Sequence, residues 1–375
     1  MPSGFGTWAT MAEVVKSHGA DGRQMAVVDT VSYKAPYLEE AYWVEANNFN
    51  SHSVLQTQSK PKGSDVRVNL GYQWEFPVTA PFIFPIQGIA TNSRIDTLLL
   101  SRERDPQGFR MSRELLTISG LKNTVHDRIN YGNNSMFPDQ INGLWTMFSN
   151  LLSGGPIGPS VIDNGGRIAP GGVPNSGECS TFSIKWGPGA VFFVFPRGGR
   201  DFIVIKDGGE QLVPDSSTPT KYFWAMVTTF IIQFGLVVED PRFVQRVANI
   251  DVGASAVATW ANPQLGANPT WQNAVPNSAP AQIAAYSQFP DDNLDGVVTY
   301  VARPVWTQMN IALESKSNVW LSMDEAWGRR VLHCHMVPIK LCERIFPVNK
   351  LIGDINPFTG QAYATPTTQY EPVAS

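Results

Sequence analysis

The chain has 375 residues, which is enough for one large domain or for two to three average ones with a substantial core. Its 28 Lys and Arg residues against 32 Asp and Glu residues give a net charge of -4, which argues against a general nucleic-acid-binding protein. Hydrophobic residues at 43% exclude a disordered chain, and only three cysteines exclude a disulfide scaffold and suit a reducing compartment.

Neither a secretory signal nor a membrane span is predicted. Residues 1–15 lack a basic segment followed by an apolar run. The most apolar stretch, residues 223–238, contains Thr228, Thr229 and Gln233 and falls short of the ~18 apolar residues that a span requires. We therefore expect a protein that folds in a cytoplasm, with residues 223–238 forming a pair of buried strands.

Residues 54–74 are predicted to form a two-stranded hairpin. Residues 66–74 alternate between apolar and other residues, as a strand does, and residues 54–58 can form its partner. A turn-forming cluster at residues 60–64 lies between the two. Because an isolated hairpin is only marginally stable, its apolar face must rest on the parent domain or on a neighbouring copy.

A long helix is predicted from Pro106 to Tyr131. Asp105 is a candidate N-cap, Pro106 suits the first helical position, and Gly132 provides a stop. Apolar residues recur every three or four positions on one stripe, and basic residues are among the solvated positions. The stripe consists of Met111, Leu115, Ile118, Leu121, Val125 and Ile129, and the solvated residues include Arg113, Lys122 and Arg128. A helix of roughly 24 residues within this range would be about 36 Å long.

The remainder of the chain is predicted to be rich in short strands separated by glycine turns. The expected strands are residues 182–186, 190–195, 201–206 and 297–301. Weaker helical patterns occupy residues 281–287 and 305–314. Loops rich in glycine, proline or asparagine occupy residues 153–177 and 262–280, and a polar tail follows Gly353.

One cluster contains the residue types of a zinc site. His333, Cys334 and His335 are consecutive, and Cys342 follows them. Alternation along a strand would place the two imidazoles on one face and Cys334 on the other, and no second Cys or His pair lies at a finger-like spacing. We expect residues alternating along a half-buried strand and no metal.

Other chemical signatures are incomplete or absent. Residues 291–296 resemble the start of a calcium loop, but its twelfth position is Ala302 instead of Glu. Neighbouring carboxylates such as Glu39 and Glu40 are adjacent in sequence, which does not make them face each other across a cleft. Phosphate-loop, nucleophile-elbow and zinc-protease motifs do not occur. We expect no catalytic residue and no cofactor.

Four stretches resemble the major capsid proteins of tailed bacteriophages, particularly those of short-tailed phages. The most telling is GLVVEDPRFVQRVANID at residues 235–251, and the first is EEAYWVEANNFNSH at residues 39–52. The others lie at residues 66–71 and 303–343. Their order and spacing, from about residue 35 to residue 352, carry the resemblance.

The resemblance implies the α+β capsid fold named after Johnson. It implies an N-terminal arm, an extended hairpin called the E-loop, a peripheral domain with a long spine helix, an axial domain and a C-terminal tail. These parts are expected at residues 1–45, 46–80, 81–250 with the spine helix at 105–131, 251–353 and 354–375.

The resemblance further implies a major capsid protein without enzymatic activity. Such a chain self-assembles as pentamers and hexamers into the icosahedral shell around phage double-stranded DNA, which it encloses without sequence recognition. Portal, scaffolding and cement proteins are the implied partners, no membrane is involved, and assembly takes place in the bacterial host cytoplasm. At the hairpin, Lys60, Lys62, Asp65 and Arg67 are predicted to make polar contacts between subunits.

Two other classes of protein stay open on the sequence. A phage tail or receptor-binding protein would also be rich in strands, but it should show repeats or coiled-coil heptads, which do not occur. A β-rich carbohydrate-active enzyme would fit the aromatic content and the low charge, and it would need two carboxylates facing each other across a cleft.

Overall fold

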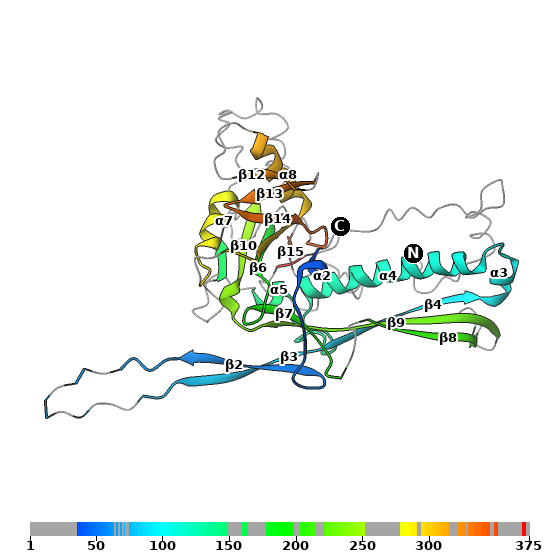
Figure 1. The fold of residues 1–375 in the computed structure, drawn as a ribbon, viewed down its shortest axis with the longest axis horizontal. Helices are drawn as coiled ribbons and strands as arrows, with labels where there is room; N and C mark the ends of the chain where they lie inside the picture. The colour runs from blue at the N-terminus through cyan, green and yellow to red at the C-terminus, as the bar shows by residue number, and fades with distance from the viewer. Residues whose placement is uncertain are drawn as a thin grey trace. The chain divides into compact units, whose positions relative to one another are not determined.

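The computed structural model describes residues 36–63, 65–66, 68–69, 71, 75–148, 160–163, 178–198, 203–214, 221–251, 278–290, 294–314, 321–326, 329–345, 349–351 and 370–372 (Figure 1). These residues fall into two compact units. Unit 1 contains residues 87–125, 203–214 and 221–234, and unit 2 contains the described residues before 87, from 126 to 198 and after 234. The strand β9 (Tyr222–Val238) and the helix α4 (Pro106–Tyr131) each contribute residues to both units.

Unit 1 is a three-stranded antiparallel sheet combined with helical segments. Its strands are β8 (Ile203–Pro214), β9 and β4 (Gln87–Asp96), in that order, and its helices are α3 (Thr97–Arg102) and the first part of α4. A buried cluster joins the end of the sheet to the helices through Ile95, Leu99, Leu100 and Phe109. The Asp96 carboxylate caps α3 by accepting a hydrogen bond from the Leu98 backbone N–H at 2.8 Å.

The prediction of two buried strands at residues 223–238 is wrong, because β9 is one strand of 17 residues. Its polar residues do not interrupt it. The Thr228 hydroxyl donates to Glu114 Oε1 at 2.7 Å and accepts a hydrogen bond from Arg110 Nη2 at 2.8 Å. A buried polar side chain with partners on a packed helix is tolerated within a strand.

The helix α4 has the predicted bounds, but only half of its predicted buried stripe is buried. Leu121, Val125 and Ile129 are in the core, whereas Met111 and Leu115 are 64% and 56% exposed. In the first half of the helix, Phe109, Arg110 and Glu114 make the contacts within unit 1 instead. Polar contacts to β9 therefore turn the apolar residues of these two turns outward.

Unit 2 contains a seven-stranded mixed sheet. The order is β12 (Leu321–Ala326), β13 (Arg329–Cys334), β14 (Val337–Leu341), β11 (Val297–Val301), β6 (Glu178–Lys185), β10 (Val244–Asp251) and β5 (Val161–Asp163). The helices are α2 (Tyr37–Glu40), α5 (Leu144–Met147), η2 (Pro241–Phe243), α7 (Ser278–Tyr286) and α8 (Arg303–Glu314). The weaker helical patterns and the strand at residues 297–301 are thus confirmed.

Several short strands of unit 2 lie outside this seven-stranded sheet. β1 (Trp43–Glu45) runs parallel to β7 (Val191–Phe195), which pairs with the last residues of β9. β15 (Asn349–Leu351) pairs with β16 (Tyr370–Pro372), and only β16 lies within the predicted tail region. Most of the loops predicted at residues 153–177 and 262–280 lies outside the described residues, although β5 falls within the first of them.

The β13–β14 hairpin corrects the expected alternation of His333, Cys334 and His335. β13 ends at Cys334, and His335 and Met336 form a two-residue turn with φ values of 50° and 69°. Left-handed conformations at both central positions suit the twist of a tight hairpin. His335 is therefore a turn residue, so the two imidazoles do not share one strand face.

The β2–β3 hairpin also differs from its prediction. β2 (Ser51–Ser59) pairs with β3 (Val78–Pro85), and not with residues 66–74. The described residues of 66–74 belong to the connecting segment, where Asn69 has a left-handed φ of 66°. The second strand is displaced because residues of β3 fit the core of unit 2, as described below.

No helix in the described parts of the chain is both long enough and apolar enough to cross a membrane.

Candidate assembly interface

The cross-strand register gives the β2–β3 hairpin two distinct faces. In an antiparallel pair, residues directly opposite each other point to the same side of the sheet. His52, Val54 and Gln56 lie opposite Phe84, Phe82 and Ala80, and we call this side the inner face. Ser53 and Leu55 lie opposite Ile83 and Pro81, and we call this side the outer face.

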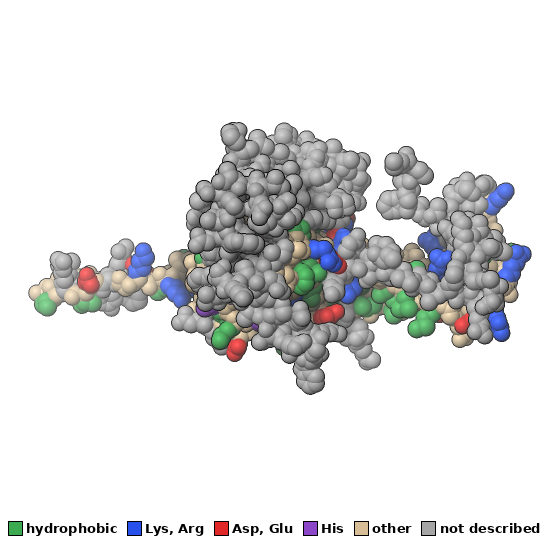
Figure 2. All heavy atoms as spheres, turned by 90° about the horizontal axis from the view of Figure 1, so that it is seen from above, with side chains coloured by type: hydrophobic (Ala, Val, Ile, Leu, Met, Phe, Trp, Pro, Cys, Tyr) green, Lys and Arg blue, Asp and Glu red, His purple; other side chains and the backbone are tan. Residues whose placement is uncertain are grey.

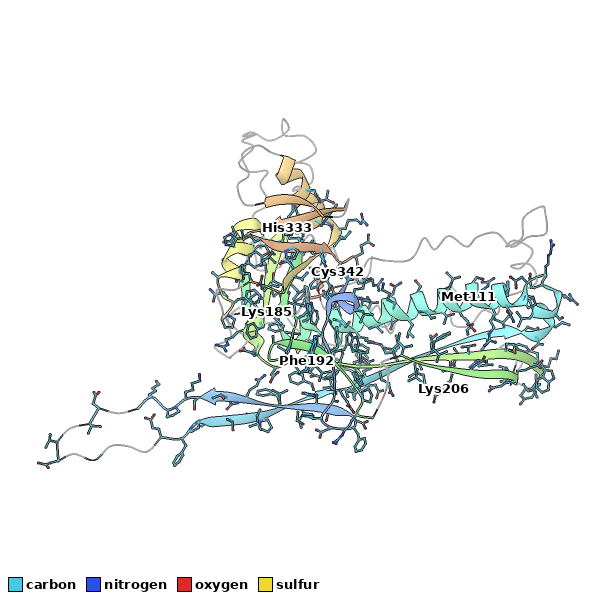
Figure 3. All side chains as sticks on the ribbon, viewed as in Figure 1. Met111, Lys185, Phe192, Lys206, His333 and Cys342 are labelled. Atoms are coloured by element: carbon cyan, nitrogen blue, oxygen red, sulfur yellow. The ribbon has the colours of Figure 1, made fainter. Side chains whose placement is uncertain are left out.

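The inner face anchors the hairpin to unit 2. Val54 is buried in a cluster with Phe192, Val194 and Val237, against which Phe84 also packs (Phe192 is labelled in Figure 3). Gln56 Nε2 donates hydrogen bonds to the carbonyl oxygens of Val238 and Glu239, at 3.3 and 2.8 Å. The base of the hairpin is therefore held by apolar burial and by hydrogen bonds.

Gly235 in β9 allows the close approach of the hairpin's end. A Cβ atom at this position would lie 2.8 Å from the carbonyl oxygen of Pro85 and 2.9 Å from Val194 Cγ2. Because the first of these is a backbone atom, it has little freedom to move away. The close packing against Pro85 thus explains why the GLVVEDPRF motif begins with glycine at position 235.

The outer face exposes apolar side chains next to the polar Ser53. Leu55 and Ile83 are 71% and 67% exposed, and Pro81 between them is also exposed. In Figure 2, a few hydrophobic side chains are visible along the hairpin at the left, among polar and charged ones. We call Leu55, Pro81 and Ile83 the outer strip. A large apolar strip exposed on a two-stranded ribbon is typical of a surface that pairs with another molecule.

The connecting segment holds the sequence-predicted contact residues. Lys60, Lys62 and Asp65 are all exposed, whereas Arg67 lies outside the described residues. Glu75, which the sequence did not indicate, closes the segment by accepting a hydrogen bond from the Lys62 backbone N–H at 2.6 Å. Three large apolar residues of the segment are also highly exposed, namely Val66, Val68 and Phe76.

The pH should change the stability of the hairpin base through His52. Its ring lies edge-on to Phe192 at 5.5 Å, and burial lowers the pKa of His52 below 6.5, although Glu239 opposes this shift. A lowered pKa stabilises the folded state above pH 6.5, and that contribution is lost as the pH falls through the folded-state value.

We expect denaturant unfolding of the wild-type chain to become easier on acidification by more than that of the His52→Phe variant. If both proteins show the same pH dependence, His52 is not responsible.

A family model described as "Major capsid protein GP7" matches residues 19–350. The chain belongs to the GP7 major capsid protein family. It is also similar to a chain of the solved structure of bacteriophage epsilon15, with 21% identity and a TM-score of 0.67 over 92% of this chain and 97% of that chain. None of the curated proteins compared matches it.

Two other solved structures show lower similarity. The capsid of bacteriophage JBD30 has 11% identity and a TM-score of 0.42, over 84% of this chain and 93% of that chain. The SrpI encapsulin of Synechococcus elongatus PCC 7942 has 11% identity and a TM-score of 0.40, over 65% of this chain and 96% of that chain.

Family membership confirms the resemblance seen in the sequence. The chain has the α+β Johnson fold of tailed-phage capsid proteins, and it is a major capsid protein that forms the phage shell. It is therefore a structural component of the virion. Of the three classes that the sequence left open, the family match selects the capsid protein over the tail protein and the carbohydrate-active enzyme.

The three cysteines should not react in the folded GP7-family subunit. Cys179, Cys334 and Cys342 are buried, and burial raises their pKa values to about 12, 11 and 12. Since the thiolate is the reactive form, alkylation near neutral pH should be negligible until the chain unfolds.

Thiol titration before and after denaturation measures this directly. Three thiols should appear only in denaturant, and a fast-reacting thiol in the native chain would contradict the burial. Among the described residues, no group of three or more His, Cys, Asp or Glu side chains is arranged to hold a metal ion.

Proposed function

We propose that the chain assembles, as pentamers and hexamers of itself, into an icosahedral shell around double-stranded phage DNA, and that the β2–β3 hairpin joins neighbouring subunits. The observation that carries the proposal is the outer strip, a row of exposed apolar side chains on a hairpin whose other face is anchored. A shell requires heterologous contacts that close into rings and further contacts that join the rings. A narrow ribbon anchored at one end can reach a neighbour without a bulky domain.

The energetic scale of such a contact is suitable for assembly. If the hairpin buries ~500 Å² of apolar surface, about 25 cal/mol per Å² gives roughly 12 kcal/mol before ordering costs are subtracted. Much of this is lost in ordering the connecting segment. The remaining contact is weak enough individually for misplaced subunits to leave a growing shell.

Polar residues of the connecting segment are proposed to set the register between subunits. Lys60, Lys62, Asp65 and Arg67 supply three positive charges and one negative charge close to the exposed Val66 and Val68. Charged pairs at the rim of an apolar contact add little affinity, but they disfavour wrong alignments. Charge reversal of Arg67 should therefore reduce the yield of closed shells more than the stability of the subunit.

The remaining proposals concern the environment of the shell. The net charge of -4 avoids strong salt-dependent attraction to packaged DNA. The shell would therefore enclose the genome without binding it tightly and without recognising its sequence. Portal, scaffolding and cement proteins are the proposed partners, and assembly is proposed to take place in the host cytoplasm. The subunit is proposed to have a structural role in the shell and to catalyse no reaction.

Electron microscopy and light scattering of the purified, recombinantly expressed chain test the proposal. Closed shells, rings or tubes tens of nanometres across would support it. A stable compact trimer, in the presence as well as in the absence of candidate scaffolding proteins, would contradict it.

A further inference from the structure

The end of the β8–β9 ribbon in unit 1 exposes large apolar side chains on one side. Leu212 lies directly opposite Trp224, and Pro214 lies directly opposite Tyr222. Directly opposed residues and alternate residues of a strand point to the same side, so all four side chains share one side of the ribbon. Leu212, Tyr222 and Trp224 are 53%, 60% and 56% exposed, and Pro214 is also exposed. We call these four residues the β8–β9 patch.

The opposite side of the same ribbon end is buried. Val213, Ala225 and Val227 form a buried cluster, against which Phe223 packs. An antiparallel ribbon with one buried side commonly carries polar residues on its other side. The apolar composition of the β8–β9 patch is therefore not explained by the folding of the isolated subunit.

The side that carries the patch is covered nearer the middle of the sheet. Met226 follows Trp224 by two residues and packs against the buried cluster that joins β4 to α3 and α4. The β8–β9 patch thus extends an apolar side of the sheet past the helices that the structure describes. Two aromatic residues are prominent in it, and Trp and Tyr are the residue types most enriched at the energetic centres of protein interfaces.

One charged residue lies at each end of the patch. Glu210 is exposed opposite Met226, at the inner end, and Lys221 is exposed immediately before β9, at the outer end. If two copies meet patch to patch about a two-fold axis perpendicular to their strands, the inner end of each ribbon lies over the outer end of the other. Lys221 of each copy then faces Glu210 of the other, and this pair occurs twice. The charges are therefore complementary between two copies of this chain.

The size of the patch suits a contact that forms only within an assembly. Aromatic side chains can bury about 150–250 Å² each, so four side chains exposed by about half present roughly 400 Å² together. Two patches would bury roughly 800 Å² in total, which is less than the ~1,200–2,000 Å² of stable specific complexes. The contact would not hold a dimer in dilute solution, but many such contacts would act together in a shell.

We propose that the β8–β9 patch is a second contact surface of the shell, at which two copies meet about a two-fold axis perpendicular to their strands. Copies of a major capsid protein form a shell, and a closed shell requires contacts that join rings as well as contacts within rings. The β2–β3 hairpin of unit 2 is proposed for one kind of contact, and the patch in unit 1 provides the other. The proposal rests on assembly into a shell, but it does not depend on the outer strip.

Cross-linking of added cysteines in assembled particles tests the contact. Leu212→Cys places a thiol at the centre of the patch, and a short bismaleimide should link two copies across sheets packed about 10 Å apart. The product is a dimer on a denaturing gel. The matched control is Gln211→Cys, which places an exposed thiol on the opposite side of the ribbon and should give several-fold less dimer. The native cysteines are buried and should not compete.

Equal dimer yields from the two variants would overturn the proposal, and so would the absence of a dimer from Leu212→Cys.

Charge exchange tests the orientation of the two copies. Lys221→Glu should lower the dimer yield of the Leu212→Cys chain a few-fold, because it places like charges opposite each other twice. Adding Glu210→Lys should restore the yield. A yield that Lys221→Glu leaves unchanged, or that the added Glu210→Lys does not restore, would overturn the two-fold arrangement.

Failure of shell assembly would be a separate result. If the wild-type chain forms no shells, the proposed function is contradicted, and the two cysteine variants are compared in concentrated solutions of the unassembled chain. The cross-linker still traps a weak contact there, so Leu212→Cys should again give more dimer than Gln211→Cys. Equal yields under these conditions would overturn the patch contact itself.

Discussion

Placing negative charges on the outer strip should abolish shell assembly while the subunit stays folded. In the Leu55→Asp, Ile83→Asp variant, both side chains are exposed in the isolated subunit, at 71% and 67%, so folding should change little. In the shell, the variant forfeits the burial of two aliphatic side chains at about 1.5–3 kcal/mol each, or roughly a 10²- to 10⁴-fold rise in the concentration needed for assembly. Light scattering against subunit concentration measures this rise.

A matched control distinguishes the effect of changing the outer strip from the effect of adding negative charge to the hairpin. Gln58 is exposed on β2 of the same hairpin and lies at the register shift between Thr57 and Ser59, so Gln58→Asp adds a charge to the hairpin without changing the outer strip. Assembly of this variant should stay within a few-fold of wild type. If the double variant assembles as readily as Gln58→Asp, the outer strip is not an interface.

Removing the buried guanidinium of Arg246 should destabilise the subunit strongly. Arg246 Nη1 donates to the carbonyl oxygen of Phe148 at 2.6 Å, Nη2 donates to Ser180 Oγ at 3.1 Å, and the guanidinium stacks 3.8 Å from the centre of the Trp145 ring. Burial lowers the pKa of Arg246 to about 10, so it remains charged at neutral pH. No carboxylate among the described residues forms an ion pair with it.

Arg246→Ala leaves the Phe148 carbonyl without its donor and opens a cavity beneath Trp145. We expect the free energy of unfolding to fall by about 3–5 kcal/mol, a large part of the 5–15 kcal/mol that folded domains typically have. Chemical denaturation of the unassembled subunit measures it. Arg246→Lys keeps the charge but loses the planar stacking, so its free energy of unfolding should lie between those of the wild-type chain and the alanine variant. A loss below ~1 kcal/mol in the alanine variant would contradict a stabilising role for the guanidinium.

The sequence was sufficient to predict those helices and strands whose bounds depend on residues within or next to the element. The bounds of α4 followed from Pro106 at its start and Gly132 after its end, and the strand at residues 297–301 followed from its composition. The half of α4 that turns outward could not be predicted. Its orientation depends on Arg110 and Glu114 contacting Thr228, a residue more than a hundred positions away.

The second strand of the hairpin was missed for a related reason. Residues 66–74 have the better local alternation, whereas β3 contains two prolines, which normally disfavour a strand. β3 prevails because Phe84 fits the cluster around Phe192, and prolines are tolerated in a two-stranded ribbon with free edges. The outer strip was consequently not predicted, although the exposure of Lys60, Lys62 and Asp65 was consistent with their place in the loop.

A cryo-EM reconstruction of particles assembled from the purified chain tests the role of the β2–β3 hairpin most directly. We expect closed shells in which Leu55 and Ile83 of each β2–β3 hairpin are covered by a neighbouring copy. Closed shells in which these two side chains remain exposed to solvent would contradict it.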